Sequence, residues 1–196
     1  MGKLLRFNLP GLQQSLGLAT FVETGTAHGD SLAHAAEAKF ERLYSIEISP
    51  LLHEGARKRF AADPRVRVIC ADSVSGLAQV LPELGERPAL FWLDAHFPGA
   101  PIANYDAEPD PTLRWPLENE LALLRQARPT HKDVVLIDDL KIYIDGPFGN
   151  GVAHPMIRSQ RARGLDFIID AFKDTHNYSV MWEDEGYMML NPRFDR

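Results

Sequence analysis

Short apolar runs of strand length alternate with segments of helical period along most of this chain. We expect parallel strands at Thr20 to Glu23, Leu43 to Glu47, Arg65 to Cys70, Ala89 to Asp94 and Asp133 to Ile137. We expect helices from about Asp30 to Phe40, from Pro50 to Phe60, over Asp72 to Val80, and from Pro116 onward with Leu117, Leu121 and Leu124 aligned. This alternation predicts an α/β sheet with crossover helices on both faces.

The pattern changes toward the end of the chain. A helix with Leu165, Ile168, Ile169 and Phe172 on one face precedes two strand-like runs, Tyr178 to Trp182 and Tyr187 to Leu190. A Glu-Gly turn joins these runs and is too short for a parallel crossover, so they predict an antiparallel hairpin. The stretches 95–115 and 145–160 are rich in proline or glycine and are candidate lid segments.

Composition narrows the class of protein. The chain has 196 residues, of which 45% are hydrophobic and 24% charged, so we expect one soluble domain over 1–196. The net charge of -6 disfavours a nucleic-acid partner. No apolar stretch is long enough for a signal peptide or a membrane span, so we expect a cytoplasmic protein without a membrane partner. The lone Cys70 lies in an apolar run and is expected to be a buried, inert thiol.

Acids stand at the ends of the first three expected strands, where an open α/β sheet binds its ligand. Glu23 opens a turn to Ser31 in which Gly25 and Gly29 allow close backbone approach, and Glu47 and Asp72 end the next two strands. A plain turn explains the glycines equally well, and a helix cap explains any one acid. Taken together, the three acids suit a ligand with a ribose, an adenine and a cationic sulfonium group. The sequence has no phosphate-binding fingerprint that would favour a nucleotide phosphate instead.

These motifs, with the closing hairpin, resemble those of the class I S-adenosylmethionine-dependent methyltransferases across nearly the whole chain. The resemblance implies a Rossmann-like seven-stranded sheet of order 3-2-1-4-5-7-6 with strand 7 antiparallel. It also implies that the loop from Glu23 to Gly29 holds the amino acid part of the cofactor, Glu47 the ribose and Asp72 the adenine. The full implied cofactor set is Glu23, Gly25, Thr26, Gly29, Ser31, Glu47, Ile48, Asp72, Ser73 and Asp94.

The fourth and fifth strands end in further carboxylates, Asp94, Asp138 and Asp139, which are the hard oxygen donors that Mg²⁺ selects. This layout is similar to the metal-dependent catechol-type and macrocin-type O-methyltransferases, a likeness that makes these acids ligands of Mg²⁺ or another divalent cation. Asp94 and His96 are the candidate catalytic residues. His96 is a candidate base, but a place in the metal shell or a structural role in the loop fits it as well.

Other residues near these strand ends are less decisive. His28 is expected to be a packing residue, and the loop acids Asp106, Glu108 and Asp110 are expected to be solvated. Lys141 and Tyr143 face either the acceptor or the next helix. The segments 94–99 and 141–148 also look like a bacterial group of methyltransferase-like proteins, a likeness that supplies no acceptor.

The leading hypothesis is a metal-assisted O-methyltransferase for a small hydroxylated acceptor, a sugar or a phenol. The same fold acting without metal is one alternative. A nucleotide-binding module without catalysis, or an NAD-binding oxidoreductase, is another, although the missing G-x-G-x-x-G counts against NAD. The oligomeric state is left open, with a homodimer as one option.

Overall fold

A seven-stranded sheet forms the centre of the molecule. The computed structural model describes residues 3–96, 111–152 and 164–194. The strands are β1 (Thr20–Thr24), β2 (Arg42–Glu47), β3 (Val66–Cys70), β4 (Ala89–Leu93), β5 (Val134–Ile137), β6 (His176–Met181) and β7 (Tyr187–Pro192). Their order is β3-β2-β1-β4-β5-β7-β6, and only β7 runs antiparallel to its neighbours. The predicted strand order and the closing hairpin are therefore confirmed.

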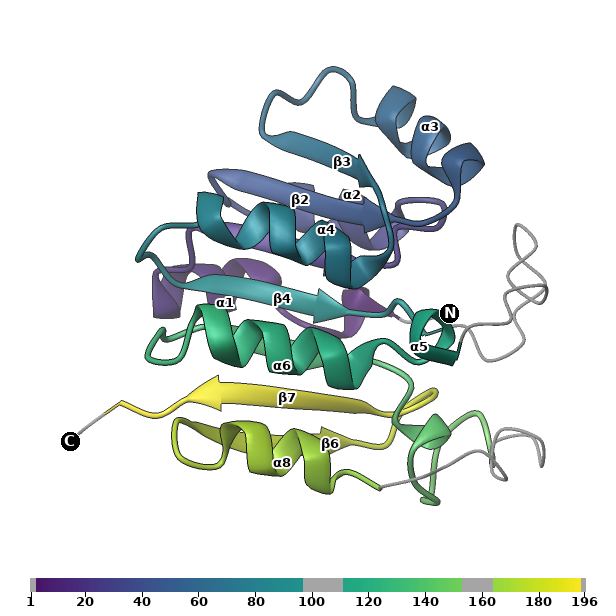
Figure 1. Cartoon of the computed structure of the whole chain (residues 1–196), viewed down its shortest axis with the longest axis vertical. Helices are drawn as coiled ribbons and strands as arrows, with labels where there is room; N and C mark the ends of the chain where they lie inside the picture. The colour runs from purple at the N-terminus through teal and green to yellow at the C-terminus, as the bar shows by residue number, and fades with distance from the viewer. Residues whose placement is uncertain (1–2, 97–110, 153–163, 195–196) are drawn as a thin grey trace.

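Helices cover both faces of this sheet (Figure 1). The α-helices are α1 (Leu9–Leu16), α2 (Asp30–Ala36), α3 (Pro50–Arg59), α4 (Ser73–Val80), α5 (Pro111–Arg114), α6 (Leu117–Ala127) and α8 (Asp166–Phe172), and the short 3₁₀ turns are η1 (Leu4–Arg6), η2 (Leu81–Glu83) and η4 (Leu140–Ile142). In Figure 1, α4, α6 and α8 lie in front of the sheet, and α1 and α2 lie behind it. No helix in the described ranges is long and apolar enough to cross a membrane.

Alternation along the strands divides the core into two clusters, because successive side chains of a strand point to opposite faces. Val22 and Phe91 pack with Leu121 of α6 on one face. Their sequence neighbours Phe21 and Trp92 pack on the other face, against η1, α1 and α2. Burial on both faces explains why the central strands read as continuous apolar runs rather than alternating ones.

Several sequence-based expectations need correction. The helix predicted to reach Phe40 ends at Ala36, and α1 was not predicted. Cys70 is exposed rather than buried, because β3 is an edge strand whose side chains are less covered. Most of the two proposed lid segments, including Asp106, Glu108 and Asp110, lies outside the described residues, so the lid hypothesis stays a prediction.

The end of the sheet opposite the carboxyl ends is held by a buried ion pair between Arg128 and Asp133. The Arg128 Nε donates to Asp133 Oδ2 at 2.7 Å, and its other nitrogens donate to the carbonyl oxygens of Gly85 and Arg87. Asp133 Oδ1 in turn accepts from the Ala89 amide at 2.8 Å. Both side chains are almost fully buried, so each charge depends on the other.

We expect Arg128→Met to destabilise the fold by about 3 to 5 kcal/mol, because it leaves the buried Asp133 carboxylate without its cation. Urea unfolding monitored by circular dichroism measures this change. Arg57→Met is the matched control, because its ion pair with Glu54 is exposed to solvent and should contribute little to stability. Equal effects of the two substitutions would contradict a structural role for the buried pair.

Candidate active site

The turn between β1 and α2 brings the backbone close to the end of β4. Gly25 and Gly29 have φ angles of +85° and +80°, which favour glycine. A Cβ on Gly25 would collide with the carbonyl oxygen of Asp94. The Gly25 amide donates to the Ile46 carbonyl at 2.9 Å, which fixes the turn against β2. The glycine therefore has a packing reason as well as the predicted ligand-binding one.

Glu23 lies beneath this turn and is fully buried. Its Oε1 accepts a hydrogen bond of 2.6 Å from Ser45 Oγ, and Ser45 also contacts the Thr26 hydroxyl. Oε2 accepts no hydrogen bond of normal geometry from any described residue. Burial raises the pKa of Glu23 to about 7, and the nearby hydroxyls of Ser45 and Ser31 partly oppose this rise. A cation near this carboxyl would therefore be strongly stabilised.

Glu47 ends β2 and is also buried. Its Oε2 accepts from the Ala27 amide and its Oε1 from the Ser49 amide, each at 2.8 Å. The carboxylate thus connects the β1–α2 turn to the start of α3. A carboxylate at the end of the second strand of such a sheet is the group that accepts hydrogen bonds from ribose hydroxyls in nucleotide-binding folds. Ile48 follows and is half-buried.

Asp72 caps helix α4, since its Oδ1 accepts from the Ser75 amide at 2.9 Å. Ser73, the first residue of that helix, is buried. The cap and the predicted adenine contact are compatible, because only one of the two Asp72 oxygens is used in the cap.

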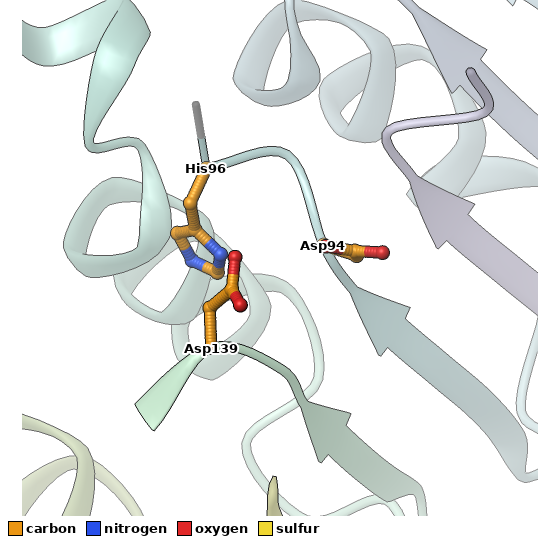
Figure 2. Close-up of side chains that lie close together, drawn as sticks. All are labelled: Asp94, His96 and Asp139. Atoms are coloured by element: carbon orange, nitrogen blue, oxygen red, sulfur yellow. The ribbon is translucent and has the colours of Figure 1, made fainter. Parts of the chain in front are cut away.

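Three side chains converge at the ends of β4 and β5: Asp94, His96 and Asp139. One ligand atom from each lies within 4.8 Å of the others. Figure 2 shows the His96 imidazole beside the Asp139 carboxylate, with Asp94 at the end of its strand to one side. Asp139 has a φ of +58°, a left-handed conformation that non-glycine residues seldom adopt and that is common at functional sites.

Asp138, the remaining acid of the predicted metal set, is not part of this group. It is fully buried, and neither of its oxygens has a hydrogen-bond partner in the described part of the chain. Burial, followed by the charge of Asp139, raises its pKa well above the ordinary value. Asp138 lies near enough to the group that its charge, when it is ionised, raises the pKa of Asp94.

The group is electrostatically strained without a cation. Burial, and then the charges of Asp138 and Asp139, raise the pKa of Asp94 well above its ordinary value. Burial raises the pKa of Asp139 to about 6 and lowers the pKa of His96 to about 3, so the imidazole is neutral. Neither His96 nitrogen has a hydrogen-bond partner among the residues described. A neutral imidazole beside two carboxyls is a donor set that binds a divalent cation.

The spacing of the three ligand atoms is compatible with such an ion. Ligand atoms at about 2.1 Å from one Mg²⁺ lie about 3 to 4.2 Å apart, so three atoms within 4.8 Å of one another are near enough to share an ion once their side chains move together. Because the set contains an imidazole, Mn²⁺, Fe²⁺ or Zn²⁺ would suit it at least as well as Mg²⁺.

Other predicted residues lie at different places. His28 is exposed, so the expectation of a packing role is wrong; the tight turn directs it to solvent. Lys141 pairs with Glu185 at 3.3 Å. Tyr143 packs against the rings of His96, Trp115 and Phe167. Of the two positions expected for Tyr143, facing the acceptor site or the next helix, it therefore contacts both the group at the site and helix α8.

Sequence reasoning missed one buried acid, Glu120 on α6. It occupies the apolar stripe of that helix together with Leu117, Leu121 and Leu124, all of them buried. A carboxylate at a core position of a helix is a signal that the sequence alone could have supplied.

Comparisons with known structures agree with this architecture. A Staphylococcus aureus protein, provisionally assigned as a caffeoyl-CoA O-methyltransferase, matches with a TM-score of 0.65 and 14% identity over 98% of this chain and 85% of that one. The Podospora anserina methyltransferase PaMTH1, bound to S-adenosylhomocysteine, matches with a TM-score of 0.60 and 13% identity over 95% of this chain and 76% of that one. A Bacillus cereus O-methyltransferase in complex with S-adenosylhomocysteine matches with a TM-score of 0.56 and 19% identity over 94% of this chain and 79% of that one.

The chain therefore has the fold of the class I S-adenosylmethionine-dependent methyltransferases, as the sequence predicts. No protein-family model and no curated protein matches the sequence. At these identities the structural likeness defines the fold, and the activity has to be argued from the site.

The raised pKa of Glu23 predicts a pH-dependent loss of stability. Below the unfolded value of 4.5 the group is protonated in both states, and as the pH rises to about 7 only the unfolded state ionises. Stability should therefore fall over this window, by up to about 3 kcal/mol. Glu23→Gln should reduce the total fall by this contribution, as measured by urea unfolding at pH 5 and pH 8, while the other buried acids keep theirs. Glu37→Gln is the exposed control; a fall of the same size in both variants would contradict the assignment.

Proposed function

We propose that the protein is an S-adenosylmethionine-dependent methyltransferase that methylates a hydroxyl group of a small acceptor, a sugar or a phenol. The observation that carries this proposal is the carboxyl edge of the sheet. There the glycine turn, Glu47 and the start of α4 lie beside the group of Asp94, His96 and Asp139. The fold neighbours bound to S-adenosylhomocysteine support the choice of cofactor.

The reaction would break the bond between the sulfonium sulfur and its methyl carbon and form a bond from that carbon to the acceptor oxygen. The acceptor hydroxyl loses its proton to a basic atom at the same edge, for which His96 and Asp94 are the candidates. A buried, neutral His96 can accept a proton, but burial disfavours the resulting imidazolium. This argues that His96 serves better as a ligand than as a base.

Asp94, Asp139 and His96 would hold a divalent cation, with Asp138 adding negative charge next to it. When bound, such an ion lowers the pKa of an acceptor hydroxyl and orients its oxygen. The chain's own contribution is to position donor and acceptor and to exclude water, because orientation supplies much of the rate in a displacement of this kind. The metal-free alternative keeps the same fold and makes His96 the base.

Calorimetry tests the cofactor assignment. We expect S-adenosylhomocysteine and S-adenosylmethionine to bind, and NAD and ATP to bind much more weakly. Glu47→Gln should weaken the binding of S-adenosylhomocysteine by about 1.5 to 3 kcal/mol, because it replaces a carboxylate that would accept hydrogen bonds from ribose hydroxyls.

Glu54→Gln, a substitution of an exposed acid on α3, is the matched control and should bind normally. A melting curve for each variant is needed, because Glu47 also holds the Ala27 and Ser49 amides. Preferential binding of NAD or ATP by the wild-type protein would contradict the methyltransferase assignment and favour a nucleotide-binding module.

The metal assignment is tested by Mn²⁺ binding, measured by electron paramagnetic resonance of the free ion. Asp139→Asn and His96→Gln should each lower the affinity for Mn²⁺ at least about tenfold. A loss of this size is typical even of residues that only orient a metal ligand. Asp138→Asn should have a smaller effect, because Asp138 is outside the converging group. A larger loss of Mn²⁺ affinity in Asp138→Asn would support the ligand set predicted from the sequence, which includes Asp138. Full activity in EDTA would favour the metal-free mechanism.

A further inference from the structure

Glu120 is a buried carboxyl group that the fold alone does not explain. It lies on the sheet-facing side of α6, is 0% exposed, and has no hydrogen-bond partner for either oxygen within the described residues. Burial raises its pKa to about 7. A buried, unpartnered acid of this kind destabilises a fold, and a leucine at the same position would continue the apolar stripe of the helix. Its presence points to a ligand.

Its neighbours place it at the cofactor end of the sheet. The hydroxyls of Ser73 and Thr24 lie near enough to lower its pKa, although neither makes a hydrogen bond of normal geometry to it. Ser73 opens α4, and Thr24 is the last residue of β1, between Glu23 and Gly25. Thr24 Oγ1 is itself buried without a partner in the described structure. Three side chains from three elements thus direct polar groups to one position.

Adenine fits these groups. Its exocyclic amine donates hydrogen bonds, and the adjacent ring nitrogens accept them. A carboxyl group accepts from the amine when ionised, and when protonated it can also donate to a ring nitrogen. Asp72, the acid predicted to receive the amine, already uses one oxygen to cap α4. Glu120 has both oxygens available, next to the hydroxyl at the start of the same helix.

We propose that Glu120 receives the exocyclic amine of the cofactor's adenine, with the Ser73 hydroxyl beside it. This inference rests on the proposed function, because it takes S-adenosylmethionine as the ligand. It adds a nucleobase-specifying residue from α6, an element outside the turns between β1 and α2 and between β3 and α4.

The test compares two ligands by calorimetry: S-adenosylhomocysteine, and S-inosylhomocysteine, in which an oxygen replaces the amine. The wild-type protein should prefer the adenosyl ligand. Glu120→Gln should reduce this preference at least about tenfold, because the amide can donate to the inosine oxygen and the lost partner was a charged acceptor. Glu118→Gln, on the exposed side of the same helix, is the control and should keep the preference.

Glu120→Asp retains the carboxyl group but shortens the side chain by one methylene. This variant should weaken the binding of S-adenosylhomocysteine more than that of S-inosylhomocysteine. It replaces Glu120→Gln in the test if that variant does not fold. An unchanged ligand ratio in folded variants overturns the inference while leaving the proposed function intact. An unchanged ratio with a raised acceptor KM would place Glu120 in the acceptor site instead. A wild-type protein that binds neither ligand would overturn the proposed function and this inference with it.

Discussion

The central constraint on this structure is the crowding of carboxyl groups at one edge of the sheet. Parallel strands bring their carboxyl ends together, so acids far apart in sequence become neighbours. Glu23, Asp138 and Glu120 are fully buried, and Asp94 and Asp139 are partly buried. Burial raises the pKa of each of the five. Like charges at this spacing cannot all ionise in a medium of low dielectric constant. The edge is therefore either partly protonated or neutralised by bound cations.

The scaffold that maintains this edge reaches the first residues of the chain. Asp184, in the turn between β6 and β7, binds Lys3 and Arg6 and accepts from the Tyr187 hydroxyl. The same turn holds the backbone that follows Asp139, since Gly186 and Glu185 accept from the Leu140 and Lys141 amides. The closing hairpin thus completes the sheet and fixes the left-handed conformation at Asp139 that turns its carboxyl toward His96.

The strands themselves were predictable because each has its own apolar run, whereas their order in the sheet was implied by the resemblance to the methyltransferases. Helix α1 was not predicted, although Asn8 caps it, Pro10 lies in its first turn and Gly17 ends it. Cys70 was misplaced because an apolar run gives no sign of whether its strand is central or at an edge.

The composition of the site was less predictable than the fold. Acids at strand ends could be read from the sequence, but the members that converge depend on backbone conformation after the strand. Asp138 and Asp139 are adjacent in sequence, but only Asp139, which has a left-handed φ, belongs to the converging group. His96 joins the group because the chain bends after β4. The contact of Glu120 with Ser73 depends on the packing of α4 against α6, a tertiary relation that local pattern does not encode.

Asp94 connects the two halves of the site. Its backbone packs against Gly25 in the cofactor turn, while its carboxyl belongs to the group with His96 and Asp139. Its pKa responds to Asp138 and Asp139 on one side and, less strongly, to Glu23 on the other. A positive charge bound at either side would therefore favour the ionised form of Asp94, which strengthens its attraction for positive charge at the other. Such coupling is reciprocal by thermodynamic necessity. In the proposed enzyme, a cationic methyl donor and a divalent cation would each relieve part of the same electrostatic strain, so the donor and acceptor ends of the site are linked through one carboxyl group.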